Sequence, residues 1–140
     1  MEKKKIKVVD TNWYVSATIN KNSRRTFFTL LSNKNIQVYY SQELLQEYEQ
    51  VISRATFSKF ISFQQVGRFI KLLLPELSPI KVSSKLRLSR DSKDDFILAL
   101  AVDAGVDYLI TSDFDLLVLQ KVGKTKILNM SDFLNSGVLS

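Results

Sequence analysis

Two aspartates in this 140-residue sequence each follow closely on a short apolar run. Asp10 comes directly after Lys5–Val9, and Asp113 comes two residues after Tyr108–Thr111. The β-branched and aromatic residues of both runs favour strands. An open parallel sheet builds its ligand sites at the carboxyl ends of its strands, so both carboxylates are candidates for chemistry. Each could instead cap the helix that follows it, because Asp is a favoured N-cap residue.

A second pair of aspartates, Asp94 and Asp95, opens a predicted helix. A capping box that begins at Ser92 and the helix dipole would explain acids in this turn without any function. When residues are placed about 100° apart around the helix, Asp94 lies at the border of the apolar face around Ile97 and Leu100. Asp95 is expected to point to solvent.

Another predicted helix, Ser41–Ser53, carries Glu47 and Glu49 at opposite margins of its apolar face. Helical geometry alone barely separates these two glutamates as site candidates. Either could also be an ordinary solvated helix residue.

The absence of His and Cys restricts the available chemistry. It excludes Ser-His-Asp triads, thiolate nucleophiles and zinc sites with Cys ligands. A set of carboxylates without His or Cys favours Mg²⁺ or Mn²⁺, which prefer oxygen ligands. Two such ions, about 3.5–4 Å apart, can activate a water and stabilise the leaving oxygen of a phosphodiester.

The net charge of +6 is unevenly distributed along the chain. Residues 1–90 carry a balance of +10, whereas residues 91–140 carry −4. A basic surface attracts phosphate backbones, although it can also serve only solubility. The candidate phosphate contacts are Arg24, Arg25, Arg54, Lys59 and Arg68.

Predicted strands alternate with predicted helices along the whole chain. The strands are Lys5–Val9, Ile36–Tyr40, Tyr108–Thr111 and Lys126–Leu128, with a further short one at Ile80–Val82. The helices are Trp13–Ser32, Ser41–Ser53, Ser62–Leu74, Asp94–Ala104 and Phe114–Val122, and a short helical turn at Ser131–Asn135. This alternation predicts one domain, residues 1–140, with a three-layer α/β/α sandwich and a mainly parallel sheet of four or five strands. No apolar run approaches the roughly 20 residues that cross a bilayer, so no membrane association is expected and a cytoplasmic location is the default.

Four pieces of the sequence together resemble the PIN-domain ribonuclease family, especially the VapC-like toxins of toxin–antitoxin pairs. The pieces are Val-Val-Asp-Thr-Asn at 8–12, Ser-Gln-Glu-Leu-Leu-Gln-Glu at 41–47, Asp-Ser-Lys-Asp-Asp-Phe-Ile-Leu at 91–98, and Tyr-Leu-Ile-Thr-Ser-Asp-Phe-Asp-Leu-Leu at 108–117. They stand in the order of the family and span most of the chain. Ser92 is one departure, because relatives often carry Pro there.

The resemblance implies a PIN-like fold and a Mg²⁺- or Mn²⁺-dependent endoribonuclease that cleaves single-stranded RNA. It places Asp10, Glu47, Asp94 and Asp113 at the catalytic metal site, with Asp115 as a reserve metal ligand, and so selects Glu47 over Glu49.

Three further residues match positions near the family's active site. Thr11, Asn12 and Thr111 would support the carboxylates or a bound water. The partners that the resemblance implies are RNA and a cognate antitoxin protein, and small domains of this family often pair as homodimers.

Two other functions compete with the nuclease. A catalytically inactive PIN module could bind nucleic acid or protein, but an inactive site has no reason to retain four carboxylates that repel one another. A carboxylate-based phosphatase usually needs a second Asp two residues after the first, and position 12 is Asn. The four glycines form no phosphate-binding loop.

Overall fold

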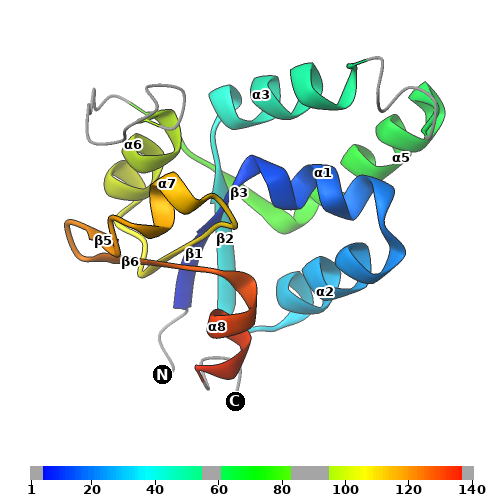
Figure 1. Ribbon diagram of the computed structural model, residues 1–140. Coiled ribbons are helices and arrows are strands. Elements are labelled where there is room, and N and C mark those ends of the chain that lie inside the picture. The colour runs from blue at the N-terminus through cyan, green and yellow to red at the C-terminus, as the bar shows by residue number, and fades with distance from the viewer. Residues whose placement is uncertain (1–4, 55–60, 83–94, 137–140) are drawn as a thin grey trace.

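The centre of the molecule is a six-stranded sheet (Figure 1). The computed structural model describes residues 5–54, 61–82 and 95–136. The strands lie in the order β3-β2-β1-β4-β6-β5, and all neighbours are parallel except the antiparallel pair β5 and β6. Their bounds are β1 (Lys5–Val9), β2 (Ile36–Tyr40), β3 (Leu77–Pro79), β4 (Tyr108–Ile110), β5 (Lys121–Val122) and β6 (Thr125–Leu128).

Helices connect these strands and cover the sheet. They are α1 (Thr11–Ile19), α2 (Lys21–Ser32), α3 (Gln42–Ile52), α5 (Phe63–Leu73), the 3₁₀ turn η1 (Leu74–Glu76), α6 (Asp95–Ala104), α7 (Phe114–Leu117) and α8 (Met130–Asn135). In Figure 1, α1, α2 and α5 lie to one side of β1 and β2, and α6 and α7 lie to the other. Parallel neighbours need such crossover connections, which are right-handed in almost all folds. The predicted α/β/α arrangement with a mainly parallel sheet is confirmed.

The prediction of one helix over Trp13–Ser32 is wrong, because the chain forms two helices that meet at Asn20. Asn20 has an extended backbone, with φ −108° and ψ 124°. Its side-chain oxygen accepts the backbone N–H groups of Asn22 at 2.8 Å and Ser23 at 3.2 Å. The side chain therefore caps α2, and the broken axis folds α2 back against α1.

The sheet has six strands rather than four or five because the helix predicted over Phe114–Val122 stops at Leu117. The chain then turns through Gln120, whose φ of 62° is left-handed, and Lys121–Val122 pairs with β6 in a hairpin. Gly123, with φ 56°, supplies the hairpin turn.

The short strand β3 also differs from the prediction of a strand at Ile80–Val82. It ends at Pro79, on the edge of the sheet, where a missing backbone N–H costs no ladder bond.

An aromatic cluster joins the helices that carry the candidate site residues. The rings of Tyr14 on α1 and Phe27 on α2 pack edge to face at 5.1 Å, and Tyr14 also contacts Tyr48 on α3 at 6.3 Å. The Tyr48 hydroxyl shares a 2.7 Å hydrogen bond with Thr18 on α1. These contacts fix α3 beside α1. In the described part of the chain, no helix is long and apolar enough to cross a membrane.

The Asn20 cap gives a test of the break between α1 and α2. We expect Asn20→Ala to lower the free energy of unfolding by about 1 kcal/mol, since an N-cap side chain is lost. For a chain of this length the melting temperature should fall by about 3 °C. Asn22→Ala, which keeps both cap hydrogen bonds, is the matched control in the same thermal melts. Equal melting temperatures for the two variants would contradict the capping role.

Candidate active site

Asp10 lies at the carboxyl end of the central strand β1 and is almost fully buried, with 6% of its surface exposed. Its backbone N–H donates to the Ile110 carbonyl at 2.9 Å, which extends the pairing of β1 with β4 by one residue. One carboxylate oxygen, Oδ1, accepts the Thr11 N–H at 2.7 Å at the start of α1. The other, Oδ2, accepts the Thr111 hydroxyl at 2.6 Å. Asp10 is therefore a helix cap and also a buried carboxylate with two donors.

Thr111 connects Asp10 to Asp113. The Thr111 side chain is fully buried at the end of β4, and its backbone N–H donates to the Leu128 carbonyl of β6. Its hydroxyl donates to Asp10 and accepts the Asp113 N–H at 3.0 Å. The Asp113 carboxylate in turn caps α7 by accepting the Asp115 N–H at 2.9 Å. One hydroxyl thus orients both strand-end aspartates predicted from the sequence.

Burial raises the pKa of the Asp10 carboxyl above its ordinary value. The hydrogen bonds from Thr111 and Thr11 lower this pKa, whereas the negative charges of Asp113 and Glu47 raise it further. The net direction is upward, so the ionised form is disfavoured at this site. A positive charge beside the three acids would favour ionisation of Asp10.

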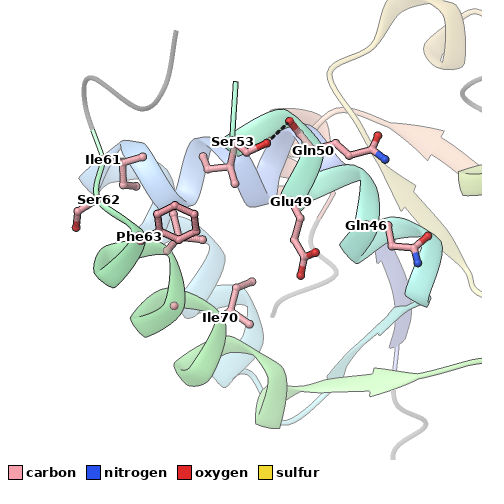
Figure 2. Close-up of a pocket in the computed structure, with 11 residues that line it drawn as sticks. Gln46, Glu49, Gln50, Ser53, Ile61, Ser62, Phe63 and Ile70 are labelled. Atoms are coloured by element: carbon pink, nitrogen blue, oxygen red, sulfur yellow. Dashed lines mark hydrogen bonds between the residues drawn. The ribbon is translucent and has the colours of Figure 1, made fainter. Parts of the chain in front are cut away.

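The structure separates the two glutamates that helical geometry left equivalent. Glu47 is half-buried and lies near enough to Asp10 to raise the pKa of its carboxyl. Glu49 is exposed and lines a pocket of about 910 Å³ between α3 and α5, where Figure 2 shows it with Phe63 and Ile70. That pocket contains none of the predicted site residues.

The other predicted acids are Asp94, Asp95 and Asp115. Asp94 lies outside the described residues. Asp95, expected to point to solvent, is half-buried at the start of α6. The single apolar face assumed for this helix is wrong, because Ile97 through Ala101 are all buried where α6 contacts β1, β5 and α3. Asp115, the reserve ligand, is half-buried in the first turn of α7.

Asp113 and Glu47, whose charges act on Asp10, are side chains of the type that binds a divalent cation. Among residues 5–54, 61–82 and 95–136, no three acids lie close enough together to hold a metal ion by themselves. The Thr11 hydroxyl, beside Asp10, is one of two buried side-chain polar atoms in these ranges without a hydrogen-bond partner. A buried hydroxyl and carboxylates form the donor set of a hard cation, so the residues present fit Mg²⁺ or Mn²⁺. Asn12, the third predicted supporting residue at this end of β1, is exposed.

Sequence reasoning missed Tyr14. Its hydroxyl is the second buried polar atom of the described residues without a hydrogen-bond partner, and burial raises the pKa of this phenol. Tyr40, at the end of β2, and Asp10 raise the same pKa, so Tyr14 lies in the electrostatic neighbourhood of the site. The only signal was its spacing of one helical turn after Thr11.

The predicted basic contacts differ in their environments. Arg24 donates from Nε to the Ala17 carbonyl and from a terminal nitrogen to the Thr18 carbonyl, both at 2.8 Å, and so caps the end of α1. Arg25, Arg54 and Arg68 are exposed. Lys59 lies outside the described residues.

Comparison with known proteins agrees with this fold. Residues 7–115 match the sequence model of the PIN domain family. The chain is also similar to the crystal structure of VapBC2 from Rickettsia felis bound to a DNA fragment from their promoter. The TM-score is 0.60 at 20% sequence identity, over 89% of this chain and 98% of that chain, and at this identity the likeness concerns the fold alone. A comparison with curated proteins finds no match.

The family match runs from within β1 to the first turn of α7, so it includes Asp10, Glu47 and Asp113. PIN domains are generally nucleases, and the family generally uses divalent metal ions. By its sequence and by its fold, this chain belongs to the PIN domain family.

Proposed function

We propose that this chain is a Mg²⁺- or Mn²⁺-dependent endoribonuclease that cleaves single-stranded RNA. The observation that carries the proposal is the environment of Asp10. This buried carboxylate accepts hydrogen bonds from Thr111 and Thr11 and is near the charges of Glu47 and Asp113. Like charges near a buried acid lower the stability of the fold. A carboxylate that serves only as a helix cap does not need such neighbours.

The proposed metal ligands are Asp10, Glu47, Asp94 and Asp113, with Asp115 in reserve. A divalent cation bound there supplies positive charge that polarises the phosphodiester and activates water. The chain's own contribution is orientation, because Thr111 fixes one oxygen of Asp10 and the backbone of Asp113 through a single hydroxyl. Hydrogen bonds that hold a metal-binding side chain in place tune metal binding in many proteins.

The charge distribution supports a polyanionic substrate. Residues 1–90 are strongly basic, and Arg25, Arg54 and Arg68 expose their side chains for phosphate contacts. We propose these three arginines, together with Lys59, as RNA contacts. Arg24 is a weaker candidate because two of its donors already bind backbone carbonyls of α1.

The biological role we propose is that of a toxin restrained by an antitoxin. Two observations support it: the resemblance to VapC-like toxins, and the similar fold in the Rickettsia felis VapBC2 complex. We also propose that the domain pairs as a homodimer, as small relatives often do.

Cleavage should depend on the metal and on Glu47 rather than Glu49. We expect purified protein to cut single-stranded RNA with Mn²⁺, to leave 5′-phosphate and 3′-hydroxyl ends, and to stop when EDTA is added. Asp10→Asn and Glu47→Gln should abolish cleavage, whereas Glu49→Gln, on the same helix, should have a mild effect. RNA end analysis by mass spectrometry and gel assays measure these outcomes. Activity in EDTA, or 2′,3′-cyclic phosphate ends, would contradict the mechanism, and no cleavage at all would favour the inactive binding module.

Removing the Asp10 charge should stabilise the metal-free protein. Because the pKa of Asp10 is raised on folding, the folded state binds more protons than the unfolded chain at pH values between the two pKa values. The free energy of unfolding therefore falls as pH rises through that window. At pH values above the window, the ionised Asp10 carboxylate keeps the free energy of unfolding at this lower value. In EDTA near pH 7, Asp10→Asn should melt at or above the wild-type temperature.

The same variant should lose the response to metal. At about 100 times the dissociation constant, Mn²⁺ should stabilise the wild type by roughly 2.7 kcal/mol and raise its melting temperature by several degrees. Asp10→Asn should gain little. The measurement is a set of melts of both proteins with Mn²⁺ and with EDTA, and equal Mn²⁺ shifts would mean that Asp10 is not a ligand.

Thr111 gives a test that leaves every proposed ligand in place. Thr111→Val removes the hydroxyl donor at similar volume and leaves a buried Asp10 oxygen unsatisfied, which should cost about 1–3 kcal/mol of unfolding free energy. Metal affinity or activity should fall about 10–100-fold, as it does when other hydrogen-bond partners of metal ligands are removed. Thr111→Ser keeps the hydroxyl and should stay near wild type in both melts and cleavage rates. If valine and serine behave alike, the hydrogen bond does not orient the site.

A further inference from the structure

An exposed aromatic side chain follows Asp113, one of the candidate site residues, directly in the chain. Phe114, the first residue of α7, is 68% exposed, although Phe is among the residue types most often buried. Its neighbour in the chain is Asp113, one of the strand-end carboxylates. Val118, 42% exposed, follows four residues later and its N–H donates to the Phe114 carbonyl, so the two form a small apolar strip.

The backbone under Phe114 is firmly held. Asp113 is bound on both sides, because its N–H donates to Thr111 and its carboxylate accepts the Asp115 N–H. Leu116, two residues after Phe114, is fully buried and anchors α7 to the core. The ring therefore projects from a fixed point, and an aromatic side chain has only two rotatable angles to order on binding.

The position of Phe114 in the chain relates it to the proposed reaction. Consecutive Cα atoms are about 3.8 Å apart, so Phe114 begins one residue step from a proposed metal ligand. Side chains on a helix tilt toward its N-terminus, and for α7 this is the end where Asp113 and Thr111 lie. We therefore expect the groups next to a phosphate held at the carboxylates to come within reach of this ring.

We propose that Phe114 is a substrate-binding residue that stacks on an unpaired nucleobase of the RNA next to the cleaved phosphate. The inference rests on the proposed ribonuclease function and adds to it the residue that selects single-stranded substrate. A base in a duplex has both faces covered, whereas an unpaired base offers a free face to an aromatic ring. Arginines hold phosphates irrespective of pairing, so the ring supplies what the basic surface cannot.

A protein surface is the other macromolecule that an exposed Phe could contact. Its place in the chain favours RNA, because Phe114 directly follows Asp113, whose backbone N–H binds the same Thr111 hydroxyl as the Asp10 carboxylate. Phe63, 95% exposed on α5, provides a comparison, since it lines the pocket between α3 and α5 that holds no predicted site residue. We expect only Phe114 to matter for RNA.

The experiment measures RNA binding without cleavage. Full-length Asp10→Asn protein, with Phe114 retained or changed to Ala, Leu or Trp, is titrated against labelled single-stranded RNA and followed by fluorescence anisotropy. Phe114→Ala should weaken binding about 5- to 150-fold, which is the range for loss of one base–aromatic stack. Phe114→Trp should bind as tightly as the parent or tighter, and Phe114→Leu should resemble Phe114→Ala. Phe63→Ala is the matched control and should bind like the parent.

An abasic substitution identifies the stacked base. RNA that lacks one base near the cleaved phosphate should bind the parent more weakly but should add little to the loss in Phe114→Ala. Additive losses at every position would overturn stacking, as would tight binding by Phe114→Leu. Unchanged RNA binding by Phe114→Ala together with lost antitoxin binding would instead assign the ring to a protein interface.

Failure of the inference and failure of the proposed function give different results. If wild-type protein cleaves RNA with Mn²⁺ and Phe114→Ala leaves the KM unchanged, only the stacking role is overturned. If the Phe114 dependence of binding appears but the wild type never cleaves, the nuclease proposal falls while the stacking contact stands. If the parent binds no RNA at all, both fall.

Discussion

The candidate site depends on placing an ionisable carboxyl where solvent hardly reaches it. A buried carboxylate is tolerated only with compensating donors, and Asp10 has two. One comes from the next residue, at the start of α1, but the other comes from a neighbouring strand. The register that pairs Val9 with Ile110 is therefore also what brings Thr111 to Asp10, so the central sheet and the site share one geometric requirement.

The rest of the fold brings further negative charge to this buried acid. The contacts of Tyr48 with Tyr14 and Thr18 hold α3 against α1, and α3 carries Glu47. α7 carries Asp113 as its cap. Both acids raise the pKa of Asp10, so apolar packing and charge repulsion oppose each other here. This is the balance expected where binding, rather than stability, has determined the residues.

Local signals in the sequence predicted the helices well where one capping side chain determines where a helix begins. Ser41 caps α3 and Ser62 forms a capping box at α5, so both helices begin where the predicted ranges Ser41–Ser53 and Ser62–Leu74 begin. The prediction missed the break at Asn20, because its cap interrupts a continuous helical pattern, and it extended α7 through a turn at Gln120. In both places a polar residue with a non-helical backbone, extended at Asn20 and left-handed at Gln120, ends the helix despite the periodicity.

The site was predictable only in part, for a different reason. The ends of the strands identify Asp10 and Asp113 as candidates, but the choice of Glu47 over Glu49 needed the family resemblance. The prediction that Asp94 borders the apolar face and that Asp95 points to solvent assumed a helix with one buried face. The role of the Thr111 hydroxyl follows from a register between strands that no local pattern encodes.

The hydrogen bond from Thr111 to Asp10 joins residues 101 positions apart in the chain. During translation the N-terminal part leaves the ribosome first, so Asp10, α1 and α3 emerge long before β4. A nascent or truncated chain that ends before β4 contains Asp10 and Glu47 but lacks the hydroxyl that orients Asp10. Assembly of the site therefore waits until most of the domain has been synthesised, and incomplete translation products carry its acids without their arrangement.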